Sequence, residues 1–261
     1  MPHPLRIGAA IPPYGPAYDD VRRAARAAEA AGADSLWTWD HFFQSGDRED
    51  PTGPNFECLT MLAALAGATS RASLGALVAC NSYRNPDLHA DMARTIDHVS
   101  GGRFVLGIGA GWFEPDYVEY GYAYGDARDR VDALAAALPR LRDRLRRLSP
   151  QPVRGRLPLL IAGGGERILM RLVAEYADLW NCYGTPAEMA HKNAILDEHC
   201  AKVGRDPDEI ARMVLLEDDE ADLAESYHEA GMTHLIVTLS APRYDLGQLE
   251  RLCAWRDQVA A

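Results

Sequence analysis

Short apolar and β-branched runs alternate along this chain with longer segments in which Ala, Leu and Arg recur at helical spacing. The short runs predict eight strands, at Leu5–Ile11, Ser35–Trp39, Ser73–Ala79, Arg103–Ile108, Leu157–Ala162, Asp178–Cys182, Met213–Leu216 and His234–Leu239. The longer segments predict a helix after each strand, at Tyr18–Ala31, Phe56–Ala68, Asp87–Val99, Asp126–Leu148, Glu166–Tyr176, Pro186–Val203, Glu217–Ala230 and Tyr244–Val259. This order predicts an α/β fold, a parallel eight-stranded (β/α)8 barrel of the TIM type.

The length of the chain agrees with one such barrel. Its 261 residues are close to the roughly 250 of a single α/β barrel, and no Pro/Gly/Ser-rich linker divides them. We therefore expect residues 1–261 to form one domain. Active sites of α/β barrels lie on the loops that follow the strands, and the longest of these loops are His41–Asn55, Cys80–Pro86 and Gly109–Gly125.

Composition narrows the class of protein. Apolar residues make up 48% of the chain and charged residues 25%, which is typical of a globular domain. The net charge of −11 argues against general affinity for nucleic acid or anionic membranes. No apolar run reaches the roughly 20 residues of a membrane span, and no signal-peptide core follows Met1–Arg6, so we expect a cytoplasmic protein. The one dense basic run predicts a solvated helix face; it contains Arg140, Arg142, Arg144, Arg146 and Arg147.

Several barrel chemistries lack the residues they need. The lysines are Lys192 and Lys202, both in a predicted helix, so a Schiff-base lysine at a strand end is not available. The histidines form no His-x-His or His-Glu-x-x-His, and no Gly-x-Ser-x-Gly occurs. The cysteines are five in number and widely spaced, which predicts buried thiols rather than disulfides or a zinc site. We expect no metal.

A first candidate for chemistry follows the second predicted strand. Asp40 and His41 end the apolar run that begins before Trp37. A carboxylate near an imidazole fixes its tautomer and helps it to donate a proton near neutral pH. The alternative is a helix-capping Asp beside a structural His.

Two glycine clusters follow predicted strands. Gly163, Gly164 and Gly165 lead from the fifth strand into a helix, a pattern that brings backbone amides and a helix amino end to an anion. A tight connection is the alternative, and a P-loop is excluded because no Gly-Lys-Ser/Thr follows. The cluster Gly107–Trp112 does not match a dinucleotide fingerprint. Its small residues allow a flat ring to lie against the backbone with Trp112 as a wall, or they simply pack the core.

Taken in order, these motifs resemble the luciferase-like monooxygenase superfamily, and within it the oxidoreductases that depend on the deazaflavin coenzyme F420. The matching segments span nearly the whole chain: Trp39–Phe43, Leu74–Val78, Tyr83–Pro86, Asp97–Arg103, Gly107–Phe113, Gly163–Arg167 and Tyr176–Asn181. The resemblance implies an α/β barrel that moves hydride between a flavin or deazaflavin and a small substrate.

The resemblance also implies places for the cofactor. Its ring would lie near Asp40, His41, Leu77, Val78 and Cys80, often over a non-prolyl cis peptide or a bulge, here at Leu77–Val78. Gly109, Ala110 and Gly111 would border it, and Gly163, Gly164 and Gly165 would hold its phosphate. Arg84 would be a scaffold residue of its loop.

The sequence thus leads to one hypothesis and two alternatives. We expect an F420-dependent oxidoreductase in which His41 transfers or stabilises a proton and Asp40 orients His41. The substrate pocket is expected to include Trp37, Trp39 and Trp112, with one of the two strand tryptophans lining it. The first alternative is an FMN-dependent monooxygenase that uses oxygen and is supplied with reduced flavin by a reductase. The second is a cofactor-binding barrel without catalysis. By resemblance we also expect a homodimer that pairs through helices near the second and third strands; the small-molecule substrate is not identified.

Overall fold

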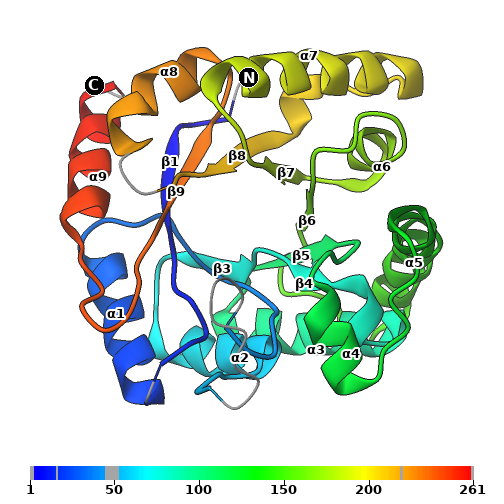
Figure 1. Cartoon of the computed structure of the whole chain (residues 1–261), viewed down its shortest axis with the longest axis horizontal. Coiled ribbons are helices and arrows are strands. Elements are labelled where there is room, and N and C mark those ends of the chain that lie inside the picture. Colours follow the sequence, from blue (N-terminus) through cyan, green and yellow to red (C-terminus); the bar gives the residue numbers. More distant parts are fainter. Residues whose placement is uncertain (1–2, 16, 45–52, 218–219, 260–261) are drawn as a thin grey trace.

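A computed structural model describes residues 3–15, 17–44, 53–217 and 220–259 and forms a closed parallel barrel surrounded by helices (Figure 1). The strands are hydrogen-bonded in the order β3-β2-β1-β9-β8-β7-β6-β5-β4, and pairing of β3 with β5 closes the ring. Their bounds are β1 Arg6–Ala10, β2 Ser35–Thr38, β3 Ser73–Ala76, β4 Ala79–Cys80, β5 Phe104–Gly109, β6 Leu159–Ala162, β7 Leu179–Cys182, β8 Ala211–Leu215 and β9 His234–Thr238. The predicted (β/α)8 barrel is therefore confirmed, with every predicted strand in place.

The third predicted strand is divided in two. Gly75 pairs with Val105, whereas Ala79 pairs with Ile108, so four residue steps on one side match three on β5. The extra residue is a one-residue bulge between β3 and β4, and the Leu77–Val78 peptide bond inside it is cis. Both features lie at the place that the family resemblance implies.

The helices follow the predicted order with shifted ends. Their bounds are α1 Tyr18–Ala30, α2 Cys58–Ala68, α3 Pro86–Ser100, α4 Glu114–Tyr120, α5 Ala127–Arg147, α6 Leu169–Tyr176, α7 Pro186–Val203, α8 Ala224–Glu229 and α9 Gly247–Val259. The prediction missed α4, which lies within the long loop after β5. It also began α6 three residues early, because Glu166–Ile168 form a turn that delays the helix after the glycines.

Helix ends carry the local chemistry that fixes them. In α7, Thr185 and Glu188 form a capping box, Pro186 opens the helix, and Gly204 closes it at φ +68°. In α5, Asp126 and Asp129 form the same kind of reciprocal cap. These caps fix where α5 and α7 begin and where α7 ends.

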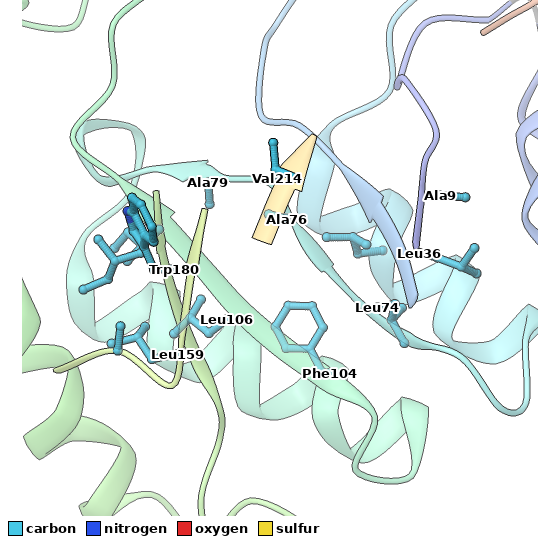
Figure 2. Close-up of a cluster of buried hydrophobic side chains, with 14 of the residues drawn as sticks. Ala9, Leu36, Leu74, Ala76, Ala79, Phe104, Leu106, Leu159, Trp180 and Val214 are labelled. Atoms are coloured by element: carbon cyan, nitrogen blue, oxygen red, sulfur yellow. The ribbon is translucent and has the colours of Figure 1, made fainter. Parts of the chain in front are cut away.

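Apolar side chains fill two layers, one between barrel and helices and one inside the barrel. Figure 2 shows part of the outer layer, where Leu36, Leu74, Phe104, Leu106 and Leu159 gather along neighbouring strands. The five cysteines are buried, free thiols, as predicted. No helix in the described part of the chain is both long and apolar enough to cross a membrane.

Candidate active site

A hollow of about 430 Å³ lies at the carboxyl ends of the strands, where an α/β barrel presents its loops. Most residues predicted for the site line it: Trp39, Asp40, His41, Leu77, Val78, Cys80, Gly109, Ala110, Gly111, Trp112 and Gly163. These positions come from four parts of the chain that the barrel closure brings together. Among the described residues, no three His, Cys, Asp or Glu side chains are grouped so that they could hold a metal ion.

His41 is held by a carboxylate from α4. Its Nδ1 lies 2.6 Å from Oδ2 of Asp116, and the Asp116 side chain is fully buried while that of His41 is 14% exposed. Asp116 also accepts hydrogen bonds from the backbone N–H of Phe42 at 3.0 Å and from the Tyr83 hydroxyl at 3.0 Å. With Nδ1 committed to Asp116, Nε2 is the ring nitrogen left to exchange a proton in the hollow.

The prediction that Asp40 orients His41 is wrong. Asp40 instead forms a two-pronged ion pair with Arg84, at 2.5 and 2.8 Å, and accepts a hydrogen bond from the Cys80 N–H at 2.9 Å. Adjacent residues on an extended segment point to opposite sides, which is why neighbours in sequence do not become partners here. The carboxylate therefore fastens β4 to β2 beneath the hollow.

Arg84 links Asp40 to a second carboxylate. Its guanidinium also pairs with Glu57, the amino-terminal cap of α2. Burial opposes the charged form of Arg84, but the hydrogen bonds and charge of Asp40 hold its pKa above the ordinary value. These contacts agree with the scaffold role that the resemblance implies for Arg84.

A neutral thiol and phenol wall lies beside the histidine. The Sγ of Cys80 and the hydroxyl of Tyr117 are 3.1 Å apart. Burial raises the pKa of both groups, and that of Tyr83, above their ordinary values. Cys80 is thus a thiol at neutral pH, so it contributes shape and a weak hydrogen bond rather than a nucleophile.

Of the three tryptophans predicted for the substrate pocket, two line the hollow and one does not. Trp39 lines the hollow and donates from Nε1 to the Tyr14 hydroxyl at 2.8 Å, and Trp112 lines it while 66% exposed. Trp37 does not line it, which corrects its assignment to the substrate pocket. It is 2% exposed inside the barrel, donates to Ser35 Oγ at 2.7 Å, and fills space that the absent side chain of Gly75 leaves free.

The glycine turn lies at one edge of the hollow. Gly163 lines it, and Gly164 and Gly165 follow just outside. No described residue accepts a hydrogen bond from the backbone N–H groups of Gly164, Gly165 or Glu166. Lys192 of α7 donates to the Gly164 carbonyl at 2.8 Å and pairs with Glu166 at 2.6 Å, so an ammonium group stands beside the free amides.

Several site residues were missed from the sequence. Asp116 is the most important. The sequence does signal its helix, because Glu114-Pro115 can open a helix and Gly121 closes it in the left-handed region, but it does not signal the contact with His41. Other lining residues, such as Asn181 and Thr238 at strand ends, carry no distinctive local pattern. The missed lining residues are Ala79, Tyr83, Phe113, Ala162, Leu169, Asn181, Tyr183, Leu215 and Thr238.

Comparisons with known proteins show the family of this chain. A family model described as luciferase-like monooxygenase matches residues 2–246. The pyrimidine monooxygenase RutA of Pseudomonas syringae pv. syringae is 30% identical over 245 residues, covering 85% of this chain and 67% of its own length.

Solved structures show the same fold. An F420-dependent secondary alcohol dehydrogenase, in complex with an F420–acetone adduct, matches 96% of this chain and 98% of its own at a TM-score of 0.83 and 16% identity. Riboflavin lyase (RcaE), with modified FMN and riboflavin, matches 87% of this chain and 66% of its own at a TM-score of 0.68 and 16% identity. By its family match, its barrel and its ordered motifs, this chain is an enzyme of the luciferase-like monooxygenase family.

Proposed function

We propose that this enzyme transfers hydride between the deazaflavin coenzyme F420 and a small organic substrate whose reacting carbon bears oxygen. The observation that carries the proposal is the pair of His41 and Asp116 at the hollow. Interconversion of an alcohol and a carbonyl moves one proton for every hydride, so it needs a side chain that takes up and returns that proton.

The residues present fit a tricyclic cofactor. A Cβ on Gly109 would lie 2.7 Å from Val78 Cγ2, and one on Gly111 would lie 2.6 Å from Cys80 Sγ, so the glycines keep this wall flat and close to the bulge. A planar ring packs well against such a wall. The free amides after Gly163, with Lys192 beside them, suit the phosphate of the cofactor.

Each protein group then has a defined task. When bound, the deazaflavin supplies the hydride chemistry, and the protein positions it and the substrate. His41 holds or returns the proton of the substrate oxygen at Nε2, while Asp116 keeps the other ring nitrogen protonated. Trp112 and Phe113 lie edge-on to the imidazole, with ring centroids at 5.6 and 5.2 Å, and shield it from water.

A flavin-dependent monooxygenase is the second candidate. The likeness to the pyrimidine monooxygenase RutA, over 85% of this chain, favours it. The glycine-flattened wall and the amides beside Lys192 suit FMN as well as F420, and this candidate requires reduced flavin from a reductase and consumes oxygen.

Turnover without oxygen separates the two candidates. The enzyme is mixed under argon with oxidised F420 and a panel of secondary alcohols, and the deazaflavin absorbance is followed. The proposal predicts loss of the oxidised chromophore for at least one alcohol, and a much smaller rate in His41→Asn. Oxygen uptake with reduced FMN, together with no reaction of F420 under argon, would favour the monooxygenase.

A further inference from the structure

A second hollow, of about 380 Å³, lies at the opposite end of β6 from the candidate site. We call it the arginine hollow; it is lined by Leu106, Leu141, Arg142, Leu145, Arg146, Gln151, Pro152, Gly155, Arg156, Leu157, Leu159, Glu175, Tyr176, Asp178, Arg205 and Glu209. It shares no lining residue with the candidate site. Leu159 and Ala162, the two ends of β6, line one hollow each, so the hollows are about 10 Å apart along the strand.

One wall of the arginine hollow is apolar. Leu106 and Leu159 face outward from neighbouring strands, and Leu141 and Leu145 face inward from α5 at helical spacing. The half-buried ring of Tyr176 closes the side toward α6. This surface can cover a ring-sized apolar group, and the volume lies in the range of small-molecule sites.

The carboxylates of the rim are already neutralised. Glu175 pairs with Arg171 at 2.8 Å, Asp178 with Arg156 at 2.7 Å and Glu209 with Arg205 at 3.0 Å. Within the described residues, Arg142 and Arg146 have no carboxylate partner. Two uncompensated positive charges therefore stand over an apolar wall in a chain whose net charge is −11.

Three arginines of the basic run of α5 have carboxylate partners among the described residues and two do not; Arg147 pairs with Asp143 on the same helix at 2.6 Å. Arg140 and Arg144 turn toward α3 and pair with Asp87 and Asp91, both at 2.8 Å. Arg142 and Arg146, also four residues apart, turn toward α6 instead. The two unpaired arginines therefore lie on the side of α5 that faces the arginine hollow.

Arg142 is held ready for a ligand. Its guanidinium carbon lies 4.5 Å from the centroid of the Tyr176 ring, and its Nη2 donates to the carbonyls of Glu175 and Tyr176 at 3.3 and 3.4 Å. Nε and Nη1 make no hydrogen bond to any residue that the structure describes. A guanidinium fixed in this way loses little side-chain freedom when it binds an anion.

We propose that the arginine hollow binds a small organic anion with an aromatic or similarly flat apolar body. Its carboxylate or phosphate head is held by Arg142 and Arg146, and its body lies on the leucines and Tyr176. The site does not depend on the function proposed for the other hollow, since the two share no residue.

Isothermal titration calorimetry tests this proposal with benzoate, phenyl phosphate and the neutral control benzyl alcohol. We expect at least one of the two anions to bind about tenfold more tightly than benzyl alcohol, and to show which head group is preferred. The double variant Arg142→Met/Arg146→Met should weaken the binding of that anion by about tenfold or more. The matched double variant Arg140→Met/Arg144→Met, with the same change of charge on the same helix, should bind as the wild type does.

A second variant guards against an indirect effect of charge. Leu145→Trp keeps both arginines and fills the apolar wall, so it should abolish binding of the ring-bearing anion. The proposal is overturned if neither anion binds the wild type, or if the Arg142→Met/Arg146→Met or the Leu145→Trp protein binds it unchanged.

Discussion

At the scale of single side chains, the orientation of His41 rests on one buried carboxylate. Asp116 binds the imidazole, a backbone N–H and a phenol at once, and each contact is 3.0 Å or shorter. Such a fully engaged carboxylate fixes both the ring plane and the tautomer of the histidine.

Asp116→Asn should change the tautomer and slow turnover. Because an amide can also donate to Nδ1, the imidazole loses its fixed Nδ1–H form, and we expect a fall of about 100-fold or more in kcat with little change in cofactor affinity. Nitrogen-15 NMR of the histidine side chain reports the tautomer without a substrate. A double variant with His41→Asn should be no slower than His41→Asn alone; additive losses would contradict joint action.

Buried His234 links stability to pH. Burial, with a smaller effect from Arg6, lowers the pKa of His234 from 6.5 to about 3. The unfolded chain therefore binds a proton first as the pH falls below 6.5, so stability is lost between pH 6.5 and 3. At pH 5, this histidine should lower the free energy of unfolding by about 2 kcal/mol relative to its value at neutral pH.

Denaturant unfolding at pH 7 and pH 5 measures that cost. The loss of stability between the two values should be smaller by about that amount in His234→Gln. The matched variant His191→Gln, at a side chain that is 66% exposed, should lose as much as the wild type. Equal losses in all three proteins would rule out His234 as the cause.

Residue roles were predicted only where the local pattern determines them. His41 and the two glycine clusters were found because they lie at or just after strand ends, which a barrel gathers, whereas Cys80 was implied by the family resemblance. The Asp116 contact spans 75 positions in sequence, and no local pattern reveals such a contact. Trp37 lies in β2 and Trp39 just beyond its end, two residues apart and so on the same side of the chain, and their depth in the barrel separates core from pocket.

At the scale of elements, the turn between β6 and α6 is the site that we propose for the cofactor phosphate. Lys192 and the free amides offer positive charge, while the Glu166 carboxylate now pairs with the lysine. The hydrogen bond and charge of Lys192 hold the pKa of Glu166 below its ordinary value. A phosphate that binds at this turn would therefore compete with Glu166 for Lys192.

Substitutions at this turn should act in opposite directions. Lys192→Met should weaken the binding of FMN by about tenfold or less and leave the binding of riboflavin, which has no phosphate, unchanged. Glu166→Gln should strengthen the binding of FMN, because it removes the carboxylate that competes for Lys192. Lys202→Met, on the same helix, is the control. If Lys192→Met weakened the binding of FMN and of riboflavin equally, the proposal that the phosphate binds at this turn would be wrong.

The wall between β5 and α4 depends on a glycine in the left-handed region. Gly111 has φ +84°, and a Cβ there would clash severely with the Tyr117 hydroxyl and would lie 2.6 Å from Cys80 Sγ. Gly121 has φ +71° with nothing within 4 Å of a Cβ. Gly121→Ala should thus cost about 1 kcal/mol from backbone strain alone, and Gly111→Ala clearly more. Thermal unfolding compares them; equal costs would contradict the crowding at Gly111.

Element types were more predictable than element ends. Hydrophobic period separates strand from helix, and Gly or Pro marks many ends, as at Gly204 of α7. The helix α4 was missed because its seven residues are too few to show a period. The division of the third strand depends on register against β5, which the strand itself does not encode.

At the scale of the whole molecule, eight repeats of strand and helix were enough to predict the barrel. Closure then follows, because each strand must pair on both sides and every inner face must be covered. The expected homodimer remains a prediction; sedimentation equilibrium should give the mass of two chains, and a single-chain mass would contradict it.

The most direct test of the proposed function is a paired titration of the purified enzyme with oxidised F420 and with FMN, followed by fluorescence. We expect micromolar or tighter binding of F420, with FMN at least about tenfold weaker. Tight FMN binding with weak F420 binding would contradict the deazaflavin assignment and favour the flavin monooxygenase. Binding of neither would contradict both and leave a barrel without a redox cofactor.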